Sequence, residues 1–190
     1  MRNEIFLDNH DQDRFYSLVG KDFKKYKMGI GLLLTQRGIP QLYYGTEILM
    51  KNFKNPSDAE VRKDFPGGWT NDTVNKFVST GRTQQENEAY DYVKKLAHFR
   101  LSCTAVKTGK FMQYVPQDGL YVYFRYDANQ TIMCIINTDS TSKNVDFKKY
   151  AESTSGFAEA INVINNNSSY STAGSFSIPA KEIWVFELQK

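Results

Sequence analysis

The spacing of apolar residues changes close to Ser102, and this change limits the folds that the chain can adopt. Before Ser102, apolar residues recur at helical intervals in two segments, and a short apolar run lies ahead of each. After Ser102, short apolar runs are separated by turn-forming residues. The order strand, helix, strand, helix is typical of parallel α/β units, whereas many successive short strands are typical of an antiparallel β-sandwich. The sequence therefore predicts α/β structure followed by all-β structure.

The first half contains two expected strands and two expected helices. Strands are expected at residues 4–7 and 41–44, and helices at residues 23–35 and 86–101. The apolar side chains of each helix fall on one face. Residues 46–85 lack periodicity, and loops of this length in a compact domain are usually functional or disordered. On the second helix the predicted apolar face consists of Tyr90, Val93, Ala97 and Leu101.

The second half is predicted to form an antiparallel sandwich of short strands. Asp118 and Gly119 are a hairpin-turn signal between the first two strands. Trp184 lies in an alternating strand, which favours a place in the core over one in an exposed carbohydrate-binding platform. The expected strands lie at residues 111–115, 120–126, 131–137, 144–147, 160–164, 176–178 and 182–188.

The composition excludes several classes of protein. Apolar residues make up 41% of the chain, so a packed core is expected. The formal net charge is +3 and no run of like charges suits a phosphate backbone, so nucleic acid is not an expected partner. No apolar run approaches the ~20 residues that cross a bilayer, so no membrane partner is expected. Cys103 and Cys134 lack the spacing of a zinc site and are expected to be buried thiols.

A polar cluster follows the first expected strand. Asp8, Asn9, His10 and Asp11 lie where that strand runs into its loop. Two interpretations are open on this pattern alone. Such residues are common turn formers. Polar residues at strand ends also form the active-site face of a parallel α/β barrel.

The first half of the chain contains two recognisable motifs, FLDNHD at residues 6–11, with Arg14 close behind, and GIPQLYYGTE at residues 38–47. They resemble signature regions of the alpha-amylase family, glycoside hydrolase family 13. The first resembles the signature that ends the seventh barrel strand, and the second resembles the signature of the eighth strand. The resemblance covers essentially the whole chain. It implies that residues 1–103 are the last two β/α units of a (β/α)8 TIM barrel and that residues 104–190 are a C-terminal β-sandwich, with the N-terminal portion of the barrel missing.

The resemblance also implies roles for the polar cluster. His10 resembles a histidine that binds a sugar hydroxyl. Asp11 resembles the third catalytic carboxylate of the family, which stabilises the transition state through hydroxyls of the distorted sugar. Asn9 and Arg14 are expected to bind substrate beside them. No metal ligand and no cofactor are evident in this chain, and calcium in the longer enzyme stays open.

One further segment suggests the branch of the family. RKDFPGGW at residues 62–69 resembles the neopullulanase and cyclomaltodextrinase branch, which occurs in starch-utilising bacteria. Its Trp69 is a candidate for substrate binding, because an indole ring can stack on a glucose face. Anchoring of the loop on the barrel is an equally open alternative for this residue.

The implied reaction is retaining hydrolysis of α-1,4 glucosidic bonds in starch, pullulan or maltooligosaccharides. Cleavage of α-1,6 bonds and transglycosylation stay open. The family's nucleophile and general acid/base belong to earlier barrel strands, so we expect this chain to be inactive alone. We also expect self-association through apolar faces that the rest of the barrel would cover.

Two other classes of function remain as alternatives. A non-catalytic amylase-like protein could bind or scaffold carbohydrate, although the presence of both His10 and Asp11 argues against it. An independent carbohydrate-binding module over residues 104–190 would need an exposed aromatic platform, which the pattern does not indicate. The compartment of the longer protein is unknown from this sequence, with a bacterial periplasm or cytoplasm as the candidates.

Overall fold

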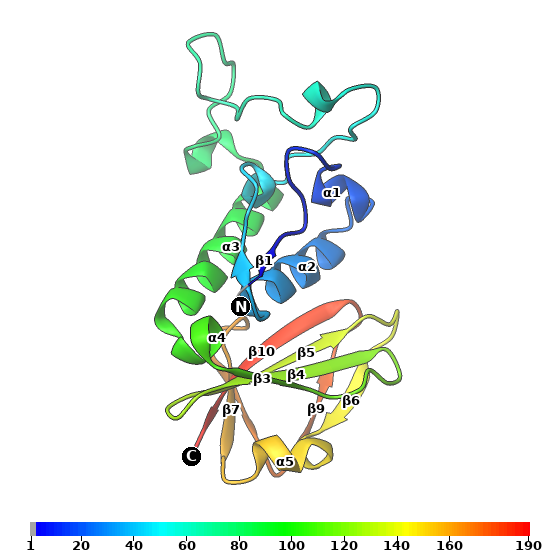
Figure 1. The fold of residues 1–190 in the computed structure, drawn as a ribbon, viewed down its shortest axis with the longest axis vertical. Helices are drawn as coiled ribbons and strands as arrows, with labels where there is room; N and C mark the ends of the chain where they lie inside the picture. The colour runs from blue at the N-terminus through cyan, green and yellow to red at the C-terminus, as the bar shows by residue number, and fades with distance from the viewer. Residues whose placement is uncertain (1–2) are drawn as a thin grey trace. The chain divides into compact units, whose positions relative to one another are not determined.

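The computed structural model describes residues 3–190, which divide into two compact units (Figure 1). The first unit comprises the described residues up to Leu33 together with Ile39–Lys95. The second comprises Leu34–Gly38 together with Leu96–Lys190.

A parallel pair of very short strands organises the first unit. Strand β1 (Glu4–Ile5) pairs with β2 (Ile39–Pro40), and the helices α1 (Phe15–Leu18) and α2 (Phe23–Thr35) lie between them in the chain. Parallel strands require such a crossover connection. Asp22 Oδ1 accepts hydrogen bonds from the first backbone N–H groups of α2, which explains where this helix begins. The predicted helix at residues 23–35 is confirmed.

The second strand was predicted at residues 41–44, and this prediction is wrong. The backbone N–H of Ile39 donates to Asn3 O, and that of Gln41 donates to Ile5 O. Because β1 has only two residues, strand pairing is limited to Ile39 and Pro40. The chain then turns at Gly45, whose φ of 82° is accessible to glycine, into a 3₁₀ turn at Thr46–Ile48. Further 3₁₀ turns at Asp58–Glu60 and Ser79–Gly81 interrupt the long loop.

Helix α3 (Gln84–Ser102) begins with a reciprocal cap. Thr83 Oγ1 accepts from the backbone N–H of Glu86, and Glu86 Oε2 accepts from that of Thr83, which together form a capping box. The predicted apolar face of this helix is wrong in part, because Leu101 is 72% exposed. Ala97 is also exposed, whereas Val93 is buried as predicted, and Ala89 and Leu96 complete the buried stripe.

The second unit contains two antiparallel sheets (Figure 1). Its larger sheet has the order β3-β4-β5-β10-β7-β8, and its smaller sheet pairs β6 with β9. The hairpin turn predicted at Asp118 and Gly119 is confirmed, since both residues have positive φ between the bridged pair Gln117 and Leu120. The elements are α4 (Thr104–Thr108), β3 (Lys110–Gln113), β4 (Leu120–Tyr126), β5 (Thr131–Asn137), β6 (Lys143–Asp146), α5 (Ala151–Thr154), β7 (Glu159–Asn162), β8 (Ser168–Ser171), β9 (Ser175–Ile178) and β10 (Glu182–Gln189).

An aromatic core joins the two sheets of the second unit. Trp184 and Phe186 on β10 pack against Phe176 on β9, and the rings of Phe176 and Trp184 stack with centroids 5.4 Å apart. Burial of such side chains is the main stabilising contribution to a domain of this kind. Trp184 is therefore a core residue, as predicted. Cys103 and Cys134 are free and buried, also as predicted.

Within residues 3–190, the helices are all too short or too polar to cross a membrane.

Candidate active site

Asp8 joins the loop after β1 to the segment after β2. Its Oδ2 accepts from the backbone N–H of Phe15 at 2.8 Å, and both carboxylate oxygens accept from Thr46 Oγ1 at 3.1 and 3.2 Å. Burial raises the pKa of the Asp8 carboxyl, and these hydrogen bonds oppose that effect. Asp8 therefore fixes the base of the loop that carries the polar cluster.

His10 and Asp11 form an exposed pair at the tip of this loop. Asn9 Oδ1 accepts from the backbone N–H of Asp11 at 2.8 Å, a local turn that orients the next residues. His10 Nε2 lies 3.2 Å from Asp11 Oδ2, and the two side chains are 61% and 57% exposed. The structure thus brings Asn9, His10 and Asp11 together and leaves the imidazole and the carboxylate accessible to a ligand.

Arg62 reaches this pair from the long loop. Its Nε donates to His10 O at 2.9 Å, and its Nη2 lies 2.9 Å from both Asp11 Oδ1 and Asp58 Oδ2. Arg62 is the first residue of the segment 62–69, whose sequence resembles one branch of the family but does not predict this contact. No local pattern could have revealed it, because 51 residues separate Arg62 from Asp11.

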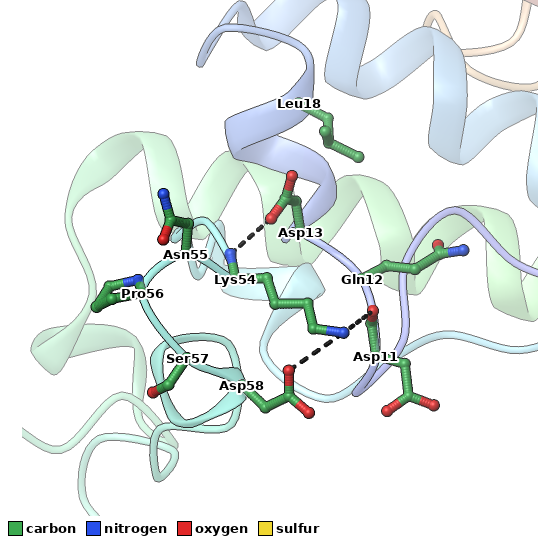
Figure 2. A pocket seen from close by; sticks show the side chains of 9 residues that line it. All are labelled: Asp11, Gln12, Asp13, Leu18, Lys54, Asn55, Pro56, Ser57 and Asp58. Atoms are coloured by element: carbon green, nitrogen blue, oxygen red, sulfur yellow. Dashed lines mark hydrogen bonds and ion pairs between the residues drawn. The ribbon is translucent and has the colours of Figure 1, made fainter.

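An open pocket lies beside Asp11 (Figure 2). Lys54 spans it: its backbone N–H donates to Asp13 Oδ1 at 2.6 Å, while its Nζ donates to Asp11 O at 3.3 Å and lies 3.2 Å from Asp58 Oδ1. Carboxylate, amide and hydroxyl groups on its walls suit a ligand rich in hydroxyls. The remaining wall residues are Gln12, Leu18, Asn55, Pro56 and Ser57.

Arg14 is buried beneath two tyrosines rather than exposed. Only 1% of its surface is accessible, and its guanidinium carbon lies 4.1 Å from the centre of the Tyr43 ring and 4.6 Å from that of Tyr44. Its Nη1 donates to Tyr44 O. Within the described residues, Arg14 Nη2 and Glu47 Oε2 are buried without a hydrogen-bond partner. Burial raises the pKa of the Glu47 carboxyl, and hydrogen bonds from the backbone at Glu47 and Gly45, followed by the charge of Arg14, oppose that effect.

Trp69 is 66% exposed on the long loop. Asp72 Oδ2 accepts from the backbone N–H groups of Gly67 and Trp69, at 2.6 and 3.1 Å, and so closes a tight turn around it. The rings of Phe65 and Phe77 pack at the base of the turn, with centroids 4.4 Å apart. A loop anchor is expected to be buried, and the Trp69 ring is not.

Trp69 is also separate from the polar cluster, since no hydrogen bond or ring contact in residues 3–190 joins it to His10 or Asp11. The same described part of the chain contains no group of three His, Cys, Asp or Glu side chains placed to hold a metal ion.

Known proteins resemble this chain in sequence. Residues 111–187 match the family described as "Cyclo-malto-dextrinase C-terminal domain". A cyclomaltodextrin glucanotransferase of Thermoanaerobacterium thermosulfurigenes is 29% identical over 188 residues, which cover 96% of this chain and 24% of that protein. An alpha-amylase of Niallia circulans is 34% identical over 137 residues, which cover 72% of this chain and 22% of that protein. The chain therefore spans about a quarter of the length of these relatives.

Solved structures share the fold. An alpha-amylase from Geobacillus thermoleovorans, complexed with acarbose, superposes with a TM-score of 0.74 at 23% sequence identity. The superposition covers 98% of this chain and 39% of the amylase chain. An Anoxybacillus alpha-amylase gives a TM-score of 0.75 at 22% sequence identity, over 98% of this chain and 38% of the amylase chain. The sheet-rich second unit is thus a C-terminal domain of the amylase type. The chain belongs to the alpha-amylase family of glycoside hydrolases.

Proposed function

We propose that the chain is the C-terminal part of an α-glucan hydrolase of the neopullulanase and cyclomaltodextrinase type. Its substrates would be starch, pullulan or maltooligosaccharides, cleaved at α-1,4 bonds with retention of configuration, and α-1,6 bonds are a further candidate. Family membership supports the substrate class, and the segment at residues 62–69 supports the branch. The observation that carries the proposal is the exposed His10 and Asp11 pair, oriented by Asn9.

The first unit is proposed to be the end of a catalytic barrel. The parallel pair β1 and β2, joined through α2, has the connectivity of consecutive strands in a (β/α)8 barrel. On this proposal residues 1–103 complete the barrel and residues 104–190 form the C-terminal domain. The polar cluster then lies at the carboxyl end of the seventh strand, the face on which such barrels carry their active sites.

Asp11 is proposed to stabilise the transition state. Cleavage with retention passes through an oxocarbenium-like state in which the sugar ring flattens, and hydrogen bonds to its hydroxyls that tighten there lower the barrier. A carboxylate accepts such bonds more strongly than a neutral group. His10 and Asn9 would bind neighbouring hydroxyls, and the exposed ring of Trp69 would stack on a glucose unit further along the chain.

The role of Arg14 in substrate binding stays a prediction. Its burial beneath Tyr43 and Tyr44 supports an indirect contribution, in which Arg14 holds these tyrosines in place. The nucleophile and the general acid/base would come from the part of the barrel that precedes this chain.

Kinetics of the intact enzyme that contains this chain test the proposed function. Asp11→Asn preserves shape and removes charge, so we expect kcat to fall about a hundredfold, which corresponds to ~3 kcal/mol. His10→Ala should cost less, because a neutral hydrogen bond contributes less than a charged one. The matched control is Asp64→Asn, a change at an exposed carboxylate of the long loop.

Maltotriose and cyclodextrin are suitable substrates for these measurements. A wild-type kcat in Asp11→Asn, with an unchanged melting temperature, would contradict the proposal. The polar cluster would then be a turn without a role in the reaction. An intact enzyme that releases no sugar at all would instead favour a carbohydrate-binding protein without activity.

A further inference from the structure

The contacts of Arg62 converge on two adjacent residues of the candidate site. One guanidinium donates through Nε to the backbone oxygen of His10 and through Nη2 to the carboxylate of Asp11, each at 2.9 Å. The rigid planar fork of arginine can make both contacts at once, and a lysine ammonium cannot replace that geometry. Arg62 therefore fixes the side chain of Asp11 relative to its own backbone.

Arg62 is itself held from its other side. Its Nη2 also contacts Asp58 Oδ2 at 2.9 Å, and Asp58 lies four residues earlier in the chain. Lys54 links the same elements again, through Asp11 O and Asp58 Oδ1. The 3₁₀ turn at Asp58–Glu60 thus supports the guanidinium, which in turn supports Asp11.

The contribution of these contacts is to orientation rather than to stability. The side chains of Arg62, Asp11 and Asp58 are 43%, 57% and 42% exposed, and ion pairs at such exposure contribute little to the free energy of unfolding. Misplacement of a reacting or stabilising group, in contrast, can lower a rate strongly even when the fold is intact.

We propose that Arg62 is a positioning residue that acts on the reaction through Asp11. This inference rests on the proposed role of Asp11 as the transition-state-stabilising carboxylate. Arg62 binds Oδ1 of the Asp11 carboxylate. The other oxygen, Oδ2, lies beside His10 and is thereby presented to the sugar in a fixed direction. The long loop after β2 would thereby set the geometry of a group that follows β1.

A double-mutant cycle on the intact enzyme tests this inference. Arg62→Gln should lower kcat between about tenfold and a hundredfold with little change in KM or melting temperature. Arg62→Lys should recover only part of this loss, since an ammonium keeps the charge but lacks the planar fork that holds two acceptors in a fixed direction. In the double variant with Asp11→Asn, Arg62→Gln should cause no further loss of kcat, because a residue that acts through Asp11 has nothing left to position.

Lys63→Gln is the matched control, since Lys63 is a neighbouring exposed cation that pairs with Glu60. Losses that multiply in the double variant would overturn the inference, as would a rise in KM with unchanged kcat, which would indicate direct sugar binding by Arg62. Unchanged kinetics in Arg62→Gln would also overturn it. A harmless Asp11→Asn would instead show that the proposed function had failed, so the two failures are distinguishable.

Discussion

The carboxylate of Glu47 lies in an environment that disfavours its charged form. Its Oε2 is buried without a hydrogen-bond partner in residues 3–190, and burial raises the pKa of the group. A buried carboxyl of raised pKa binds its proton more tightly in the folded chain than in the unfolded chain. The free energy of unfolding therefore decreases as the pH rises from the ordinary carboxyl pKa through the raised value. Above that value the destabilisation is fully present.

Glu47→Gln should remove this destabilisation. We expect the variant to be more stable than the wild-type chain near neutral pH, by the order of 1 kcal/mol that is ordinary for single substitutions. The advantage should shrink as the pH falls towards the ordinary carboxyl pKa of about 4. Denaturant unfolding of this chain across that pH range measures both effects, with Glu88→Gln as the exposed control. A variant that is less stable at neutral pH would contradict the sign of the argument.

The loop that carries Trp69 is closed by two glycines. A Cβ on Gly81 would lie 1.7 Å from Asn75 O, and a Cβ on Gly67, where φ is 106°, would lie 2.6 Å from Asn75 Cα. Side chains at either position are therefore incompatible with the closed loop. Asn75 in turn orients the backbone N–H of Phe77 through its Oδ1. The exposed Trp69 is thus presented by a constrained segment.

Gly81→Ala should open this loop without unfolding the rest of the chain. We expect faster limited proteolysis within residues 65–82 and no comparable change elsewhere, because cleavage follows local opening. Gly68→Ala is the matched control, since the nearest atom to its added Cβ is Phe65 O at 3.6 Å. Equal cleavage rates in the two variants would refute the packing argument.

The elements that could be predicted from the sequence are those with a regular pattern of their own. The helix at residues 23–35 and the strands at residues 120–126 and 131–137 have the predicted bounds. Strand β8 was missed because Ser168–Ser171 is rich in serine and only Tyr170 packs against the core. The start of α3 could have been found, since Thr83 and Glu86 have the spacing of a capping box.

Pairing between distant segments could not be predicted in this way. The bounds of β2 depend on the two residues of β1, and the contact of Arg62 with Asp11 depends on the course of the whole intervening loop. The polar cluster itself was identified through its resemblance to a family signature, because turn-forming residues at a strand end have more than one explanation.

In the molecule as a whole, the family match and the candidate site residues lie in different units. The second unit has an aromatic core and a six-stranded sheet, and it carries the match to an amylase-type C-terminal domain. The first unit carries the exposed His10 and Asp11 pair. The chain spans about a quarter of the length of its curated relatives, and in the proposal above the nucleophile and the general acid/base come from outside it.

Release of reducing sugar is the most direct test of the central claim, which is that this chain supplies binding groups to an α-glucan hydrolase. The measurement compares the isolated chain with the intact enzyme on maltooligosaccharides and pullulan. Because a glycosyl-enzyme intermediate needs a nucleophile and a proton donor, we expect the intact enzyme to release sugar and the isolated chain to release none. Sustained release by the purified chain, or none by the intact enzyme, would contradict the account.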